Sequence, residues 1–346
     1  MRSLGTIGVA LALSGCATID YYAQAVSGHL EVMWRAVPIE ERLREPDTPE
    51  TLKTKLERVL AVREFASREL ALPDNGSFRR YADLGRPFVL WNVFAAPEFS
   101  LKPLESCFLL AGCVGYRGYY SEEKAERYAT TLAERGYDVY VGGVPAYSTL
   151  GWFNDPVLST FVQYPEAELA RIVFHELAHQ VVYVKDDTMF NESFAATVEE
   201  EGVRRWLERE GTPAQRAAYE DTRRRRAEFT ALLLKHRGRL AAFYERPGTT
   251  EEKREGKRRL FAEMQDEYRA LRASWDGFAG YDRLFARGAN NALLASVAAY
   301  RELVPAFRAL LAENRGDLAA FYAAVRELAR LDKSERDARL AAISGR

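Results

Sequence analysis

Apolar residues recur with helical spacing over most of the chain, beginning close to the N-terminus. An amphipathic segment at residues 17–45 predicts a helix that leads into the body of the protein. A second pattern, between Leu52 and Leu70, predicts another helix, which the turn-forming residues 73–76 end. Because apolar residues three and four apart share one helix face, both segments are expected to pack against a core.

Short runs rich in β-branched and aromatic residues follow these helices. They lie at residues 88–94, 107–114 and 138–141, and each is of strand length. A helix from about 121 to 134, ended by Gly136, separates the last two runs. This part of the chain therefore predicts a small β-sheet with a helix.

From residue 165 the pattern becomes helical and stays so almost to the C-terminus. One helix is predicted over residues 166–184, and a second is predicted to begin near Asn191. The long helical remainder has predicted breaks at 246–248, 277–280 and 288. The fold class expected is α+β: a mostly helical protein with a small β-sheet before the helix at 166–184.

The first 16 residues have the layout of a secretory signal. Arg2 precedes an apolar stretch that is too short to span a bilayer. The ending Leu-Ser-Gly-Cys resembles the bacterial lipoprotein box, which implies cleavage before Cys16 and lipid attachment to that residue. A plain signal peptide with an incidental cysteine is the alternative. Since Ala17 rather than Asp follows, the resemblance favours a periplasm-facing protein anchored in the outer membrane of a bacterial cell envelope.

Net charge and cysteine content narrow the class of protein further. With 49 Lys and Arg against 50 Asp and Glu, the formal charge of −1 argues against a nucleic-acid binder. Once Cys16 carries lipid, Cys107 and Cys113 remain as an even number in an oxidising compartment, which predicts a local disulfide. Zinc ligation by this pair is the weaker interpretation, because no other Cys or His lies nearby in the sequence.

The motif His175-Glu176-Leu-Ala-His179 is the most informative feature of the sequence. Residues four apart lie one helical turn apart on one face, so the two imidazoles can bind one metal ion. Glu176, the residue after His175, projects from the helix at a different angle from the two histidines. There it can act as general base on a metal-bound water. The apolar flanks at 172–174 and 181–183 predict a buried helix, in which a His-Glu-His set without a metal would be costly. We therefore expect Zn²⁺ here.

A catalytic zinc ion takes three protein ligands and leaves one position for water. Glu192 is the first candidate for the third ligand, since a loop lets the chain reverse and bring it opposite the histidines. Glu199, two helical turns further on, is its main rival. Asp186 and Asp187 are further rivals, although a role in capping the loop or orienting a ligand histidine suits them better.

Much of the chain resembles a bacterial family of predicted zinc aminopeptidases. The family's ligand pattern falls on His175, His179 and Glu192, with Glu176 as the base, and more broadly the motif is similar to the gluzincins, thermolysin-like peptidases. The resemblance implies a zinc-dependent aminopeptidase that acts on envelope peptides or protein N-termini; an endopeptidase and a non-catalytic zinc lipoprotein remain alternatives. The matching segments are CFLLAGCVGYRGYYSEEKA, YDVYVGGVPAYSTLGWFNDPVLSTF, FHELAHQVVYVKDDTMFNESFA, NNALLASVAAYRELVPAF and SGHLEVMWRAVPIEERL.

Similarity to gluzincins also implies an edge strand beside the metal that pairs with the extended substrate. Gly143, Val144, Ala146 and Tyr147 are the residues expected to do so, and Pro145 would limit unwanted pairing. The alternative is a turn that leads to a buried strand.

A donor to the oxyanion of the reaction is expected besides zinc. Tyr300 is favoured, because residues 290–300 could form a helix that closes the cleft. Tyr147, Tyr183, Asn290 and Asn291 remain candidates.

His236 lies between two basic residues and is expected on the surface. The resulting organisation has three parts: 1–15, the signal peptide; 16–160, N-terminal helices and the β-containing subdomain with the substrate edge strand; and 161–346, the zinc-binding helices and a helical C-terminal subdomain.

Overall fold

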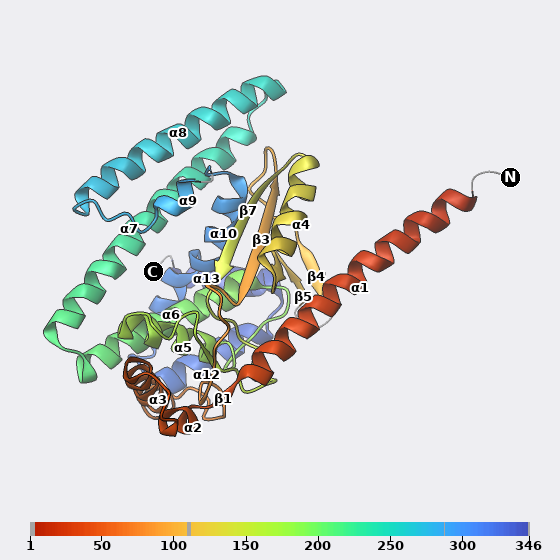
Figure 1. Cartoon of the computed structure of the whole chain (residues 1–346). Coiled ribbons are helices and arrows are strands. Elements are labelled where there is room, and N and C mark those ends of the chain that lie inside the picture. Colours follow the sequence, from red (N-terminus) through yellow and green to blue (C-terminus); the bar gives the residue numbers. More distant parts are fainter. Residues whose placement is uncertain (1–3, 109–111, 287, 345–346) are drawn as a thin grey trace.

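Helices make up most of the structure, a computed structural model that describes residues 4–108, 112–286 and 288–344 (Figure 1). The side chains of residues 4–18, 286 and 298–301 lie outside this description. The helices of the described chain are α1 (Leu4–Arg35), α2 (Ile39–Arg44), α3 (Glu50–Leu70), α4 (Glu122–Glu134), α5 (Glu166–Ala178), α6 (Thr188–Glu210), α7 (Pro213–Tyr244), α8 (Thr250–Ser274), α9 (Asp282–Ala286), α10 (Asn291–Arg301), α11 (Val304–Glu313), α12 (Leu318–Arg330) and α13 (Lys333–Ser344).

The strands of the described residues form small sheets, so the expected α+β class is confirmed. They are β1 (Val37–Pro38), β2 (Arg80–Ala82), β3 (Leu90–Pro97), β4 (Ser106–Phe108), β5 (Gly112–Val114), β6 (Arg117–Tyr119), β7 (Tyr137–Val144) and β8 (Val157–Leu158). In the main sheet β3 lies between β6 and β7 and is antiparallel to both. A second sheet has the order β1-β2-β8, and β4 and β5 form a hairpin.

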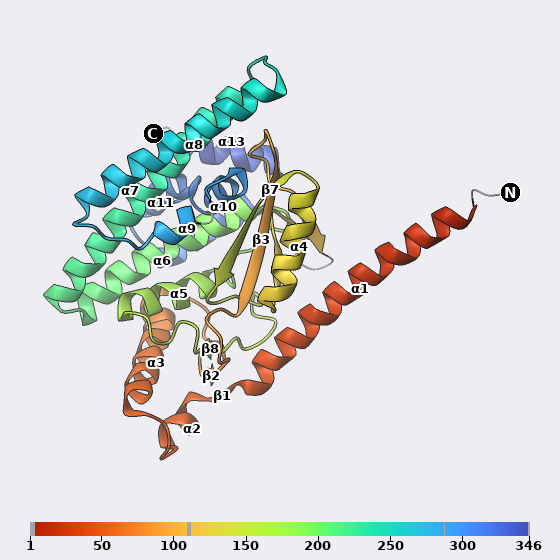
Figure 2. The ribbon, with the colours of Figure 1, turned by 45° about the horizontal axis from the view of Figure 1, so that its top comes forward.

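The main sheet lies between α4 and the helical body (Figures 1 and 2). On the α4 side, Trp91 and Val93 of β3 pack with Ala125 and Leu132 of the helix. Alternate residues of a strand point to opposite faces, so Leu90 and its even-numbered neighbours face the helical body instead. That second face forms part of the candidate site described below.

The largest apolar core surrounds α5. It joins α3, α5 and α6 to the C-terminal helices α11 and α12. It thus contains residues from both of the predicted parts, 16–160 and 161–346. Phe174 of α5 is fully buried, and Phe65 of α3 packs edge-on against Trp206 of α6 with 5.2 Å between ring centroids. Because α5 is enclosed on these sides, its position is fixed by packing, and its C-terminal end reaches a cavity.

Helix α1 runs along the main sheet and projects beyond the body at its N-terminal end (Figures 1 and 2). The side-chain amide of Gln24 accepts a hydrogen bond from the backbone of Tyr120 at 3.1 Å and donates one to the carbonyl of Gly118 at 3.5 Å. A Cβ at Gly28 would lie 2.2 Å from the ring of Tyr120, so only glycine permits this close approach. Within the residues that the structure describes, no helix is long and apolar enough to cross a membrane.

Several predicted boundaries are wrong. The helical run expected over residues 17–45 is interrupted, because Val37 and Pro38 form β1 and pair with β2. The helix expected over 166–184 ends at Ala178, and the next begins at Thr188 rather than near Asn191, because Asp187 caps it. In contrast, the breaks predicted around 246–248, 277–280 and 288 are confirmed.

His236 is not a surface residue. It lies on α7, where α8 packs against it and covers the ring completely. Its Nε2 atom is 3.3 Å from a carboxylate oxygen of Glu267 on α8. The charged neighbours of His236 in sequence misled the prediction, since they point to other faces of the same helix.

Candidate metal centre and active site

The end of α5 and the start of α6 meet at one point of the fold. His175 lies in the last turn of α5, His179 is its C-terminal cap, and Glu192 lies in the first turns of α6. Asn191 fixes the connecting loop, because its side chain accepts a hydrogen bond from the backbone N–H of Val184 and donates one to the carbonyl of the same residue, both at 2.7 Å. The loop therefore delivers Glu192 opposite the two histidines.

The potential ligand atoms of this trio converge closely. The Nε2 atoms of His175 and His179 are 3.2 Å apart. Carboxylate oxygens of Glu192 lie 3.3 Å from Nε2 of His175 and 3.7 Å from Nε2 of His179. Four ligands held tetrahedrally at zinc-ligand distances are separated by about 3.4 Å from one another. The donor set and its spacing thus fit a zinc ion.

The electrostatics of the trio also fit a cation. Burial alone lowers the pKa of His175, but hydrogen bonds to Glu192 and Glu199 and their charges outweigh it and raise this pKa to about 10. Burial lowers the pKa of His179 to about 4, which keeps its imidazole neutral and its lone pair available. Burial raises the pKa of the Glu192 carboxyl, but its electrostatic interactions with His179 and His175 and its hydrogen bond to His175 outweigh burial and lower this pKa. Two buried carboxylates beside the histidines thus favour positive charge here.

Glu199 contacts the far side of His175. Its carboxylate is 2.9 Å from Nδ1 of that ring, only 1% exposed, and paired with Arg171 at 2.9 Å. A carboxylate on the second ring nitrogen of a metal-binding histidine fixes the tautomer and orientation of the ring. Glu199 is therefore placed to orient His175, and it is not among the residues whose ligand atoms converge with those of Glu192.

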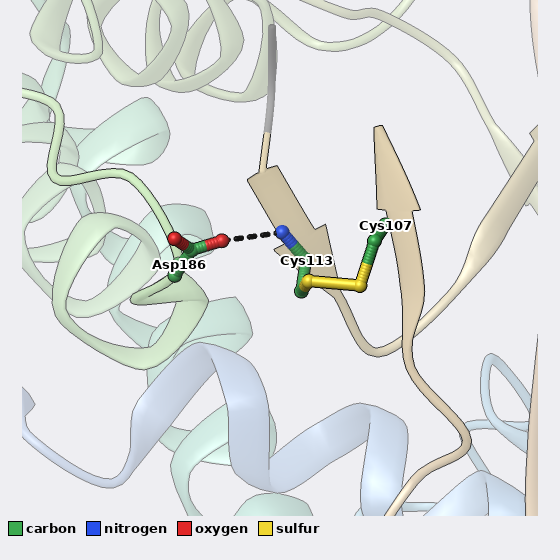
Figure 3. Close-up of a disulfide and its surroundings, with 3 residues drawn as sticks. All are labelled: Cys107, Cys113 and Asp186. Atoms are coloured by element: carbon green, nitrogen blue, oxygen red, sulfur yellow. Dashed lines mark hydrogen bonds between the residues drawn. A yellow bond between two sulfur atoms is a disulfide. The ribbon is translucent and has the colours of Figure 1, made fainter. Parts of the chain in front are cut away.

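Asp186 and Asp187 lie in the loop but have other partners. Asp186 accepts a hydrogen bond from the backbone N–H of Cys113 at 2.5 Å, as Figure 3 shows. Asp187 caps α6 through Phe190 and forms an ion pair with Arg336 of α13 at 2.7 Å. Both residues tie the loop to neighbouring elements.

Cys107 and Cys113 form a disulfide that joins the two strands of the β4–β5 hairpin (Figure 3). Phe108 and Val114, the next residues on these strands, line the cavity that contains the histidines. The contact of Asp186 with Cys113 connects this hairpin to the loop between α5 and α6. The hairpin is thus a braced wall of the candidate site.

The trio opens into a cavity of about 370 Å³ between the main sheet, α1, the β4–β5 hairpin and the α5–α6 pair. This volume lies at the small end of the range for ligand pockets, about 300–1,000 Å³. Glu176 also lines it, and burial raises the pKa of that carboxyl to about 7. The lining residues are Tyr21, Ala25, Leu90, Asn92, Phe108, Val114, Tyr116, Gly118, Tyr120, Val144, Ala146, Tyr147, Ser148, Leu150, His175, Glu176, His179, Tyr183, Thr188, Asn191 and Glu192.

The segment expected to bind substrate is partly strand and partly turn. Gly143 and Val144 end β7, which lies at an edge of the main sheet, whereas Ala146 and Tyr147 belong to the following loop. Val144, Ala146 and Tyr147 line the cavity. Gly143 is in register with Trp91, whose side chain faces α4. Gly143 therefore also faces α4, on the side of the sheet away from the cavity.

The predicted oxyanion donors fall in three groups. Tyr147 and Tyr183 line the cavity. Asn290 caps α10 and donates to the carbonyl of Val139 on β7, and Asn291 donates to the carbonyls of Pro97 and Glu98 at the end of β3, so both hold α10 to the main sheet. Tyr300 belongs to α10, but its side chain lies outside the described residues.

Sequence reasoning missed the aromatic wall opposite the histidines. Tyr116 lines the cavity, and burial together with the charges of Glu192 and Glu176 raises the pKa of its hydroxyl. Tyr21 and Tyr120 line the same cavity. The hydroxyl of Tyr147 forms a hydrogen bond with Nδ1 of His29 at 2.8 Å. The tyrosine-rich stretch around residues 116–120 was the available signal, because buried tyrosines near a metal motif need polar partners.

Comparison with known proteins places the chain in one family. No curated protein and no solved structure matches it. The sequence profile of the family described as putative aminopeptidase matches residues 20–340, which includes every residue of the site above. The chain therefore belongs to the putative aminopeptidase family.

Proposed function

We propose that this chain is a zinc-dependent aminopeptidase in which His175, His179 and Glu192 hold the metal and Glu176 is the general base. The observation that carries the proposal is the convergence of the three ligand atoms, all within 4.8 Å of one another, inside a cavity that Glu176 also lines. The family's description supports hydrolysis of peptides from the amino end.

Zinc, when bound, supplies a Lewis acid that polarises the scissile carbonyl and lowers the pKa of a coordinated water toward neutrality. Glu176 takes the proton of the attacking water and delivers it to the nitrogen of the leaving amine. A carboxyl with a pKa of about 7 suits both steps near neutral pH, because it gains and loses a proton readily there.

Other residues of the chain hold this arrangement in place. Glu199 orients His175, and Arg171 compensates the buried charge of Glu199. Val144 and Ala146 lie beside the histidines, where an extended peptide can pair with the end of the β7 edge. Tyr116, Tyr147 and Tyr183 supply hydroxyls that can donate to the oxyanion.

The protein is further proposed to be anchored by lipid on Cys16 at the periplasmic side of the bacterial outer membrane. The disulfide between Cys107 and Cys113 supports an oxidising compartment. Substrates would then be peptides of the envelope or the N-termini of its proteins.

The test is a comparison of Glu176→Gln with the matched variant Glu208→Gln, whose carboxylate lies exposed on α6. Glu176→Gln should retain zinc, measured by elemental analysis, while kcat for unblocked peptides falls about 10²–10⁴-fold. Glu208→Gln should keep both metal and activity. Full activity of Glu176→Gln, or a purified protein that binds no zinc, would contradict the proposal.

A further inference from the structure

The cavity has few carboxylates. Among its described lining residues the acids are Glu192, proposed as a metal ligand, and Glu176, proposed as the base. Every Asp and Glu of the chain lies in the part whose side chains are described, because the remaining residues are not acidic. An aminopeptidase must recognise a terminal amino group, and here no further carboxylate is left to bind it as an ammonium ion.

Asn92 offers a different partner for that group. It lies on β3, lines the cavity and is only 6% exposed, and its side-chain oxygen has no hydrogen-bond partner among the described residues. Leaving a buried acceptor unpaired costs about 1–3 kcal/mol. A donor that enters with the substrate would remove this cost.

The strands on either side make room for such a donor. Asn92 is in register with Gly118 of β6 and Gly142 of β7, and residues in register on neighbouring strands point to the same face. Because both neighbours are glycines, neither adds a side chain beside the Asn92 amide, and the ring of Tyr140 lies 3.2 Å from where a Cβ at Gly142 would be. A Cβ at Gly118 would lie 3.1 Å from the Asn92 oxygen, close enough to crowd it.

We propose that Oδ1 of Asn92 accepts a hydrogen bond from the terminal amino group of the substrate, so that a neutral amide takes the place of a carboxylate. This inference rests on the proposed peptidase function and adds the recognition of the substrate's amino end. An unpaired charge is costly to bury, so the amine binds in its neutral form. Since the pKa of a terminal amine is about 7.7–8.0, KM for unblocked peptides should fall as pH rises from 6.5 to 8.5.

The experiment measures KM and kcat against pH for the full-length zinc-loaded protein, Asn92→Asp and Asn92→Leu, with unblocked and N-acetylated versions of the same peptides. Asn92→Leu should raise KM for unblocked peptides about tenfold with little change in kcat. Asn92→Asp should lower that KM at pH 6.5 and flatten its pH dependence, because a carboxylate accepts the ammonium form. Asn314→Asp, on a distant helix, is the control that leaves KM unchanged.

The possible failures are distinguishable. If the wild-type protein with zinc hydrolyses no peptide, the peptidase proposal fails and this inference fails with it. If it hydrolyses peptides and both Asn92 variants keep the wild-type KM and pH profile, only the role of Asn92 is wrong. Should Asn92→Leu unfold, as thermal denaturation would show, the pH profile of Asn92→Asp decides alone.

A second, independent observation concerns the outer face of α1. Residues at spacings of three and four lie on one side of a helix, and the outer side of α1 carries large apolar side chains exposed to solvent. Gln24 and Val32 mark the opposite side, which is buried against the body. The exposed residues are Ile19 (70%), Tyr22 (42%), Val26 (58%), Leu30 (39%) and Trp34 (80%).

A neighbouring loop extends this apolar face. Trp152 and Phe153 are 73% and 52% exposed, and the ring of Phe153 is 4.7 Å from that of His29 on α1. Together with the five residues of α1, they account for the exposed large apolar side chains of the described chain apart from Phe278. An exposed apolar patch concentrated on one face marks an interaction surface.

We infer that this apolar face lies in the interface of a lipid bilayer. Cys16, the proposed lipid attachment, precedes Ile19 by three residues on the same helix, so the lipid would place this face at the membrane. Trp34 and Tyr22 belong to the residue types enriched at lipid-water interfaces. The five exposed residues of α1 include no charge, as an interfacial helix requires of its buried side.

The experiment is flotation with vesicles of phosphatidylethanolamine and phosphatidylglycerol, using residues 16–346 with Cys16→Ser so that neither the signal segment nor a lipid contributes. Adding Val26→Ser and Trp34→Ser should weaken vesicle binding about tenfold or more, since each loses an apolar side chain from the interface. Phe278→Ser, an exposed apolar residue elsewhere, should not change it. Equal vesicle binding by Cys16→Ser and by both of its further variants would contradict the inference. So would a dimer that forms without vesicles and that Val26→Ser and Trp34→Ser dissociate, because the apolar face would then bind a second copy of the chain.

Discussion

The α5–α6 pair and the α7–α8 hairpin are both packed helix pairs with many charged residues, but they use charge differently. In α5–α6 the ionisable groups His179 and Glu199 are 7% and 1% exposed, and Glu199 is paired with Arg171. In α7–α8 the charges of Arg239 and Glu263 pair at the surface, with side chains about 40% exposed. The convergence of several buried ionisable groups, rather than the number of charges, therefore distinguishes a candidate site from a helix pair whose charges pair at the surface.

Zinc binding should produce the largest difference between the two pairs. Saturating zinc at about 1,000 times its Kd should raise the free energy of unfolding by about 4 kcal/mol, because the ion binds only the folded state. Glu192→Ala should abolish this rise, while Glu263→Ala on α8 should preserve it. Urea denaturation with and without zinc measures the effect, and a rise that survives in Glu192→Ala would place the ion elsewhere.

The sequence allowed the central part of this site to be predicted, and the reasons are local. Helical periodicity alone puts His175 and His179 on one face, and a short loop constrains where Glu192 can lie. Asn92 and Tyr116 could not be found in this way, because they reach the cavity through the pairing of β3 with β6, which no local pattern specifies. Strands of two or three residues, such as β6, are too short to leave an alternation in the sequence.

Asp155, in the loop between β7 and β8, allows a test of a buried carboxylate that is not one of the proposed metal ligands. Burial raises its pKa from 3.8 to about 6, and one of its oxygens has no partner among the described residues. Between these two values the folded state binds more protons than the unfolded state, so stability falls as pH rises. The loss should amount to up to about 3 kcal/mol between pH 4 and 6 and should be absent in Asp155→Asn.

The measurement is urea denaturation of metal-free protein at several pH values, taken as the difference between wild type and Asp155→Asn. The metal ligands titrate alike in both proteins and cancel in this difference, whereas Glu176, whose pKa the charge of Asp155 raises, contributes to it. Asp337→Asn, exposed on α13, is the control and should follow the wild-type profile. If the difference in unfolding free energy between wild type and Asp155→Asn does not change with pH, Asp155 does not retain its proton in the folded state.

Glu199→Gln should change zinc binding at the α5–α6 pair by less than Glu192→Ala does. The amide can still contact Nδ1 of His175, but it lacks the charge that makes the ring a better ligand. Zinc affinity should fall about 10–100-fold, as competition with a chelator of known affinity would measure. The control is Glu200→Gln, one residue further along α6. An unchanged affinity for Glu199→Gln would mean that His175 is oriented by packing alone.

The smallest effect is expected at the α7–α8 surface. A double-mutant cycle on Arg239→Ala and Glu263→Ala should give a coupling energy of about 0.2–1 kcal/mol, because the pair is exposed and screened by salt. Raising the salt concentration should reduce it further. A coupling of several kcal/mol would show that surface pairs here resemble the buried pair of Glu199 and Arg171.

Tyr21 and Ala25 of α1 form part of the cavity wall, and Tyr21 follows Cys16 by only five residues of continuous helix. At 1.5 Å per residue, the attachment point and the wall are separated by about 8 Å along the helix axis. If the protein is a lipid-anchored peptidase, so short a connection keeps the cavity next to the bilayer and away from distant substrates. If lipid holds Cys16, the substrates are chain ends that come to the bilayer, and a soluble form cut beyond Ala25 would lose Tyr21 and Ala25 from the cavity wall.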